Sequence, residues 1–199
     1  MSTFWTGLLI AVAIIVVIAG GSFTWLVWRL NEETVTPLTV SNPDGTAGKA
    51  LVVYQPGLSS FPKRVTEAFS EGLVASGWQV STTTASSKAP AAVAGYDLII
   101  LSSPVYGGAP GKPLARYIER VADFGRKPVV VLLTGAGDVE PAIKLTEQMV
   151  VRAGGRAIRS LGLTTMKPND EANKYTGSNT DRAIQIARET GRALQPAVQ

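Results

Sequence analysis

Three short segments rich in Gly, Ser and Pro contain most of the groups in this chain that could bind a ligand. They are residues 55–61, 103–111 and 135–139. The first reads Gln-Pro-Gly-Leu-Ser-Ser-Phe and leads into an expected helix whose first turn carries a Lys-Arg pair. Two hydroxyls, a glycine and the backbone N–H groups of a helix N-terminus are suited to bind a phosphate group. The alternative is a capped helix start preceded by a solvated loop.

The second segment centres on Tyr106, which lies between a Pro-Val pair and two glycines. Its ring could flank a flat ligand, and the neighbouring backbone amides could reach polar atoms of such a ring. The alternative is a turn whose tyrosine covers the end of a sheet. The third segment begins Gly-Ala-Gly-Asp and gives close access to the backbone and a single carboxylate, Asp138.

The composition removes several classes of chemistry. The chain has no Cys and no His, which excludes disulfides, thiol nucleophiles, Cys- or His-ligated metals and a Ser-His-Asp triad. Gly135-Ala136-Gly137 lacks the third glycine of a dinucleotide-binding motif, and Gly111-Lys112 lacks the first glycine and the hydroxyl of a P-loop. We therefore predict no catalytic residue and no metal ligand. Chemistry would depend on a bound cofactor, carboxylates, lysines, hydroxyls or backbone dipoles.

From residue 50 onward, short β-branched runs alternate with helical patterns. Two of the runs, 98–101 and 129–133, are apolar on both faces, as expected for parallel strands with helices on both sides. Proline near the start and glycine after the end mark several of the helices. The expected strands are 50–54, 78–82, 97–102, 128–134 and 156–161. The expected helices run from 62 to a stop at 77, over 113–121 and 140–153, and over about 180–194.

Five strands that alternate with helices predict a doubly wound α/β fold with a five-stranded parallel sheet. Right-handed crossovers and the chain length favour the strand order 2-1-3-4-5. In that order a ligand crevice lies beyond the carboxyl ends of strands one and three. The three segments follow strands one, three and four, so we expect them to meet at this end of the sheet.

The N-terminal part predicts one transmembrane helix before the sheet. Residues 4–28 carry no charge, and as a helix they would span about 37 Å, enough to cross a hydrocarbon core of about 30 Å. Trp5, Trp25 and Trp28 lie near its two ends, where indole rings favour the membrane interface. A cleaved signal peptide is the alternative, but no basic residue precedes the apolar run. Arg29 favours a cytoplasmic location for the remainder of a single-pass membrane protein.

We expect three parts: a membrane anchor over residues 1–30, a linker over 31–49 and one domain over 50–199. The linker is rich in Thr, Asn, Pro, Gly and Ser without an apolar period, which is typical of a flexible tether. An ordered leading strand around 34–40 is the alternative. Residues 41–199 hold 18 Lys and Arg and 13 Asp and Glu, and this net charge of +5 would let the domain lie on anionic lipid. The basic residues are scattered, so we expect no nucleic acid as a partner.

Residues 50–194 resemble the flavodoxin-like proteins. The segment Leu-Val-Val-Tyr-Gln-Pro-Gly-Leu-Ser at 51–59 is similar to the first strand and phosphate loop of that family. Residues 96–106 are similar to its third strand and first flavin-contacting loop, and residues 135–138 to the second such loop. The usual phosphate loop has the pattern T-x-T-G-x-T. Here the loop is one residue longer, keeps only serines and is followed by Pro62, which has no amide donor.

The resemblance implies that the chain binds FMN, whose flavin carries electrons or hydride. Ser59 and Ser60 would hold the phosphate, Tyr106 and its neighbours would contact one side of the isoalloxazine, and residues 135–138 the other. The implied function is electron transfer or flavin-dependent redox chemistry at the membrane, with a redox partner protein or a quinone. The altered phosphate loop favours an alternative, a flavin-free interaction module tethered to the membrane. The expected cofactor-binding residues are Gln55, Gly57, Leu58, Ser59, Ser60, Phe61, Ser103, Pro104, Val105, Tyr106, Gly107, Gly135, Ala136, Gly137 and Asp138.

Overall fold

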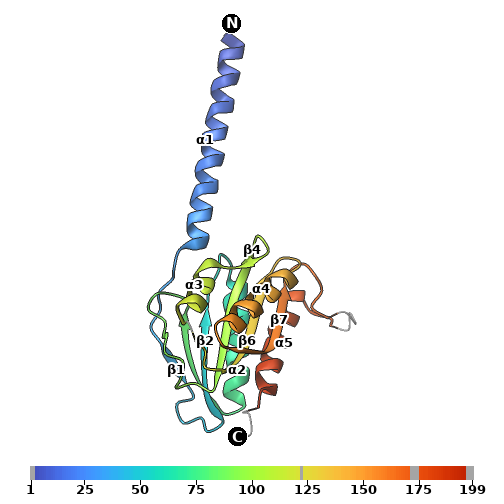
Figure 1. Ribbon diagram of the computed structural model, residues 1–199. Coiled ribbons are helices and arrows are strands. Elements are labelled where there is room, and N and C mark those ends of the chain that lie inside the picture. Colours follow the sequence, from blue (N-terminus) through green and yellow to red (C-terminus); the bar gives the residue numbers. More distant parts are fainter. Residues whose placement is uncertain (1–2, 122, 171–174, 196–199) are drawn as a thin grey trace. The chain divides into compact units, whose positions relative to one another are not determined.

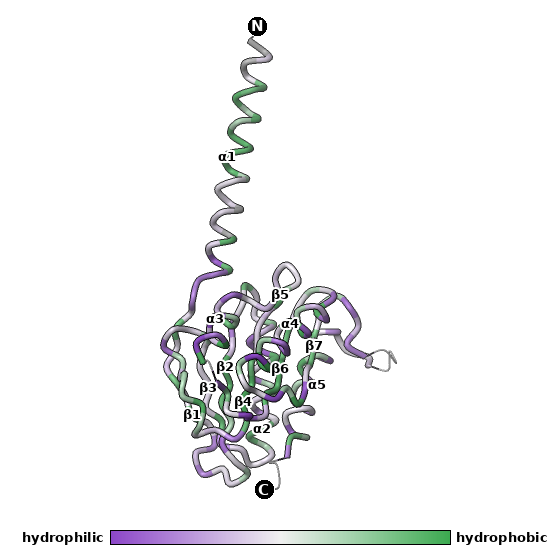
Figure 2. Tube along the Cα trace, in the orientation of Figure 1, coloured by the Kyte–Doolittle hydropathy of each residue, from purple (hydrophilic) through white to green (hydrophobic). Residues whose placement is uncertain are grey.

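The computed structural model describes residues 3–121, 123–170 and 175–195, and the chain divides into two compact units between Glu32 and Glu33. The first unit is helix α1 (Thr3–Asn31), which is long and apolar enough to cross a membrane by length and composition. Its large apolar side chains are exposed, and Figure 2 shows apolar residues along much of the helix. Residues 3–30 of the expected anchor therefore lie in one continuous helix.

The second unit is built on a sheet with the strand order β1-β3-β2-β4-β6-β7. Five of these strands are parallel, and their order β3-β2-β4-β6-β7 is the predicted order 2-1-3-4-5. Figure 1 shows helices packed on both sides of this sheet, so the predicted flavodoxin-like α/β fold is confirmed. The strands are β1 (Thr39–Ser41), β2 (Gly48–Tyr54), β3 (Trp78–Thr84), β4 (Leu98–Tyr106), β5 (Ala109–Pro110), β6 (Pro128–Gly135) and β7 (Arg156–Thr164).

Each face of the sheet carries its own apolar core. On one face, α3 (Lys112–Val121) and α4 (Glu140–Arg152) bury residues such as Tyr117 and Ile143 against the strands. On the other face, α2 (Ser60–Ala75) and α5 (Asn179–Ala193) bury residues such as Phe69 and Ala187. The runs that are apolar on both faces, 98–101 and 129–133, are fully or almost fully buried between these two layers. Their composition is the reason that the strand positions could be predicted.

Two antiparallel strands are additional to the predicted pattern. β5 pairs with the end of β4 to form a hairpin, and β1 pairs with β3 at the edge of the sheet. Between β3 and β4, where no helix was predicted, residues 85–97 form turns and bends. This segment still covers the sheet, because Ala89 and Val93 are buried and the Tyr117 hydroxyl donates to the Pro90 carbonyl at 2.9 Å.

The expected linker over 31–49 differs from the structure, in which residues 33–49 belong to the second compact unit. Residues 39–41 form β1, and we call residues 33–38, which precede it, the strap. The strap is held by Thr36, which exchanges hydrogen bonds with Thr84 through both backbone N–H groups and both hydroxyls. These bonds join residues 48 positions apart in the chain. The local composition carries no sign of them, so it suggested a flexible tether.

Candidate functional site

The loop after β2, residues 55–59, lies directly against the end of β4. Gly57 has a φ of 77°, a backbone conformation that favours glycine. A Cβ atom built on Gly57 would lie 3.1 Å from Pro104 Cγ and 3.2 Å from the Tyr106 hydroxyl. The backbone N–H of Leu58 donates to the same hydroxyl at 3.1 Å. The first and second predicted segments are therefore in contact.

The second segment is a hairpin, whereas a loop was expected. Its residues 103–106 belong to β4, and the two-residue turn consists of Gly107 and Gly108, with φ values of 59° and 77°. Positive φ at both positions is the geometry of a type I′ turn, which glycine adopts without strain. Tyr106 is half-buried at the end of the strand, and this burial raises the pKa of its phenol. The phenol therefore stays protonated at neutral pH.

The loop after β6 completes the cluster. A Cβ built on Gly135 would lie 3.8 Å from Val105 Cβ, which places the third segment beside the second. The carbonyls of Gly135 and Ala136 accept hydrogen bonds from the N–H groups of residues 165 and 166, after β7. The Asp138 carboxylate accepts the Glu140 N–H at 3.1 Å and holds the start of α4. The loops after β2, β4 and β6 thus lie together at the carboxyl ends of the strands. We call this end of the sheet, with the segments that follow β2, β3, β4, β6 and β7, the carboxyl rim.

Four of the predicted ligand-binding residues are buried: Gln55, Phe61, Ser103 and Pro104. Gln55 and Ser103 are buried behind the loops, and the Ser103 hydroxyl accepts the Gly111 N–H at 2.9 Å. A Cβ built on Gly111 would overlap the Gln55 amide, so a larger residue here would displace that side chain. Phe61 is buried in the core under α2. Because they are buried, these four side chains do not line the exposed surface.

The N-terminus of α2 is open and positively charged. Ser59 is its N-cap residue, in an extended conformation, but its side chain makes no capping hydrogen bond. The first turn contains no acidic residue and instead contains Lys63, which Arg64 follows in the sequence. Cations at this end of a helix are unfavourable, whereas an anion would be stabilised by the helix dipole and by the unbonded N–H groups. Exposed Ser59 and Ser60 hydroxyls add two donors.

The two basic side chains are held loosely by neighbouring carboxylates. Lys63 pairs with Glu67 on the same helix at 3.6 Å, and Arg64 pairs with Asp181 of α5 at 3.6 Å. All four side chains are about half exposed, and pairs of this kind contribute little to stability. The arrangement can therefore accept an anion at the start of α2 without the loss of a strong ion pair.

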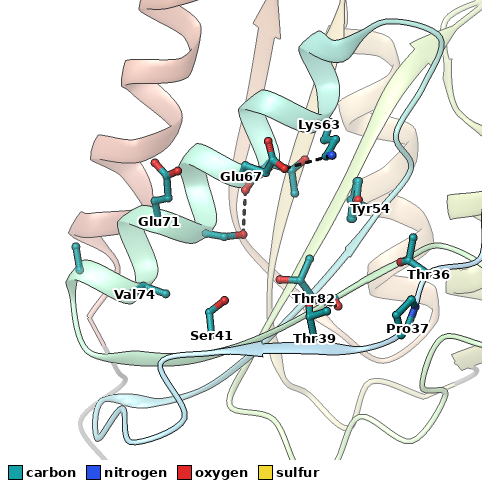
Figure 3. A pocket seen from close by; sticks show the side chains of 13 residues that line it. Thr36, Pro37, Thr39, Ser41, Tyr54, Lys63, Glu67, Glu71, Val74 and Thr82 are labelled. Carbon is teal, nitrogen blue, oxygen red and sulfur yellow. Dashed lines mark hydrogen bonds and ion pairs between the residues drawn. The ribbon is translucent and has the colours of Figure 1, made fainter.

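A separate cavity of about 710 Å³ lies between α2 and the sheet edge formed by β1 and β3. In Figure 3, side chains of α2 form one wall, and Thr39 and Thr82 lie opposite on the strands. Sequence reasoning missed this cavity because it depends on β1, which pairs with a strand some forty residues away. Its lining residues include none of the fifteen predicted cofactor-binding residues. They are Thr36, Pro37, Thr39, Ser41, Tyr54, Lys63, Thr66, Glu67, Ser70, Glu71, Val74, Ala75 and Thr82.

No group of three or more acidic residues that could hold a metal ion occurs among the residues that the structure describes. The loops after β2, β4 and β6, with the start of α2, offer backbone amides, hydroxyls, glycines, one tyrosine, one carboxylate and two basic side chains. This set is suited to a flat, phosphorylated organic molecule, since it combines an anion site with a half-buried aromatic ring and close backbone access.

Comparison with known proteins shows the fold. No protein-family model matches the chain, and no curated protein matches it. Among solved structures, flavodoxin 2 from Bacillus cereus is 19% identical with a TM-score of 0.57, and the match covers 73% of this chain and 99% of that chain. An NAD(P)H:quinone oxidoreductase from Methanothermobacter marburgensis is 17% identical with a TM-score of 0.52, covering 74% and 96%.

A flavodoxin from the domain Archaea is 14% identical with a TM-score of 0.56, covering 72% of this chain and 94% of that chain. At these identities the likeness establishes the fold alone. The second unit of the chain has the flavodoxin-like fold. Each of these three structures matches it over almost its whole length.

Proposed function

We propose that this chain binds FMN at the carboxyl rim and takes part in flavin-dependent redox chemistry while anchored in a membrane by α1. The observation that carries the proposal is the uncapped, basic N-terminus of α2, in contact with Tyr106 on a glycine-rich hairpin. Similar structures with this fold are named flavodoxins, a quinone oxidoreductase and azoreductases, which supports redox chemistry as the class of function. A bound flavin would supply one- and two-electron transfer.

The residues present fit such a cofactor. Ser59, Ser60 and the first backbone amides of α2 would bind the phosphate, with Lys63 and Arg64 compensating its charge. Tyr106 and Val105, with the turn glycines, would flank one side of the ring system. A Cβ on Gly107, Gly108 or Gly137 would meet no atom within 4 Å, so the backbone at these positions is accessible. Asp138 would set the electrostatic environment on the other side.

The decisive experiment separates recognition of the phosphate from recognition of the ring. We expect the detergent-purified full chain to show flavin absorption bands, and FMN to bind more tightly than riboflavin, which lacks the phosphate. Each charge-assisted hydrogen bond contributes about 1.5–3 kcal/mol. FMN affinity of the variant Ser59→Ala/Ser60→Ala should therefore fall at least about tenfold, whereas its riboflavin affinity should change little.

Ser178→Ala is the matched control, because Ser178 is the N-cap residue of the neighbouring helix α5. This variant should retain the FMN affinity of the natural sequence. A colourless protein that does not bind added FMN in a fluorescence titration would contradict the proposal.

The acceptor is the second part of the proposal. The chain would pass electrons to a redox partner protein or reduce a quinone at the membrane. The reconstituted, FMN-loaded protein should turn over a quinone with a nicotinamide donor if it acts as an enzyme, and should only exchange electrons stoichiometrically if it acts as a carrier.

One observation favours a second candidate, a flavin-free interaction module. The Tyr106 hydroxyl already occupies the Leu58 N–H, one of the amides of the expected phosphate loop. If this bond is the permanent role of Tyr106, Tyr106→Phe should lower the stability of the protein without creating FMN binding. If the site accepts FMN, the same variant should bind FMN at least as tightly as the natural sequence, because the Leu58 amide becomes available.

A further inference from the structure

The strap joins the compact unit at the carboxyl rim. Thr84 is the last residue of β3, so it lies at the carboxyl end of the sheet. Its N–H donates to the Thr36 hydroxyl at 3.1 Å, and the Thr36 N–H donates to the Thr84 hydroxyl at 3.0 Å. The Thr84 hydroxyl also donates to the Thr34 carbonyl, and the Thr83 hydroxyl to the Thr36 carbonyl at 3.1 Å. This cluster holds residues 34–36 at the end of β3.

Glu33 extends the same attachment by one residue. Its carboxylate accepts the Ser87 N–H at 2.9 Å and pairs with Arg116 of α3 at 3.5 Å. The hydrogen bond from Ser87 is the main reason that the pKa of Glu33 lies below its ordinary value. Helix α1 ends at Asn31, and two residues span at most about 7 Å. The C-terminal end of α1 is therefore no more than about 7 Å from Glu33, whatever direction the helix takes.

The same rim exposes an unusual combination of side chains. Leu58 is 54% exposed after β2, and Met166 is 80% exposed after β7. Three exposed lysines accompany them: Lys88 after β3, Lys112 at the start of α3 and Lys167 after β7. Among the described residues, none of these lysines forms an ion pair. We call these five residues the rim patch; the exposed carboxylate of Asp138 lies on the same rim.

We propose that the rim patch rests on an anionic lipid bilayer, so that the carboxyl rim faces the membrane surface. Lysines near such a surface contribute about 1 kcal/mol each, and exposed apolar side chains enter the headgroup region. The short attachment keeps the patch near the bilayer at all times, so weak contacts suffice for binding. The inference rests on the proposed anchor and does not require a flavin. It implies that a molecule dissolved in the membrane has direct access to the loops of the candidate site.

The opposite end of the sheet provides a matched control surface. Arg126, Lys127 and Arg156 gather there: the Arg156 N–H donates to the Lys127 carbonyl at the start of β6 and β7. Ile158 on β7 is 43% exposed on that half of the strand. β6 has eight residues, so the two ends of the sheet lie about 23 Å apart. A bilayer that touches the rim patch does not reach these residues.

The absence of Cys in the chain allows site-specific spin labels. The full chain would be reconstituted in vesicles with and without anionic lipid, carrying a label at one of four positions: L58C, M166C, I158C or V16C in α1. Labels at 58 and 166 should collide with lipid-soluble oxygen about twofold or more as often as the label at 158, because the headgroup region admits apolar reagents. We call the amount by which the collision rate at 58 or 166 exceeds that at 158 the excess. It should fall in neutral vesicles and in high salt.

Each outcome has a separate meaning. A label at 16 that is exposed to water contradicts the proposed anchor, and the inference fails with it. A label at 16 in lipid, together with equal collision rates at 58, 166 and 158, overturns the rim contact alone.

A charge test uses a triple variant at each end of the sheet. Lys88→Gln/Lys112→Gln/Lys167→Gln should reduce the excess at position 166 to its level in neutral vesicles. The control variant Arg126→Gln/Lys127→Gln/Arg156→Gln removes the same charge from the far end and should leave the excess unchanged. An equal loss in both variants would show that net charge, and not the rim patch, binds the lipid.

Discussion

Two helices that lie side by side on one face of the sheet, α2 and α5, begin in opposite ways. At the start of α5, the Ser178 hydroxyl accepts the Asp181 N–H at 3.1 Å, and Asp181 places a carboxylate in the first turn. At the start of α2, Ser59 makes no capping bond, and the first turn carries Lys63, followed by Arg64. One terminus is satisfied by its own side chains, and the other is left open.

This difference supports the start of α2 as the proposed ligand site. A carboxylate near a helix N-terminus stabilises the helix, and a cation there destabilises it. The start of α2 is therefore less stable than it would be with ordinary capping residues, and a bound phosphate would supply the missing anion. The start of α2 borders the loops of the carboxyl rim, and a local loss of stability is expected at a binding site.

The largest expected effect comes from the contact that holds the two helices together. A Cβ built on Gly191 of α5 would overlap the Phe69 carbonyl oxygen of α2. We expect Gly191→Ala to lower the free energy of unfolding by about 1–3 kcal/mol, since backbone cannot move aside easily. Gly95→Ala is the control, because a Cβ there would meet no atom within 4 Å. Denaturant unfolding measures both; equal stabilities would mean that the helices can separate without cost.

The second effect tests the caps directly. Ser178→Ala removes a capping hydrogen bond and should cost about 1 kcal/mol. Ser59→Ala removes no such bond and should cost less than about 0.5 kcal/mol in the absence of ligand. If thermal unfolding shows similar losses for both variants, the start of α2 is capped in solution and the comparison fails.

The third prediction is a substitution that should raise the stability of the protein and lower its affinity for FMN. Ser60→Asp introduces a carboxylate at an exposed position in the first turn of α2. The ligand-free protein should gain about 0.3–1 kcal/mol in stability from the helix dipole. FMN affinity should fall, because the carboxylate repels the phosphate. Ser60→Asn is the uncharged control and should show neither effect at full size; equal behaviour of the two variants would exclude a charge effect.

The smallest effect concerns Glu33, a carboxylate that accepts a backbone N–H as a capping residue does. Its folded-state pKa lies below the ordinary value of 4.5, so it contributes stability above 4.5 that is lost as the pH falls through the folded value. At neutral pH we expect the unfolding midpoint of the natural sequence to be slightly higher than that of Glu33→Gln. In strong acid the two midpoints should be equal. A difference that is independent of pH would mean that the charge of Glu33 has no role.

Some parts of this fold could be predicted because their signals are local. β6 is buried on both faces and reads as an unbroken apolar run, and α2 shows its apolar stripe between a proline and a glycine. The extra strand β1 has only three residues, all exposed, so its own residues carry no signal of pairing. Gln55 was expected to contact a ligand and is buried, because a polar residue after a strand reads the same in either role.

By itself, the sequence determined the alternation of strands and helices, the strand order and the end of the sheet where the glycine-rich segments gather. These follow from periodicity and from the handedness of crossovers, which act over short stretches of chain. Only the tertiary structure decided that Tyr106 reaches the Leu58 amide, that β1 closes a cavity against α2 and that the strap joins the carboxyl rim. Each of these contacts joins residues some forty to fifty positions apart, and a hydrogen bond over that separation exists only after the core has brought the two segments together.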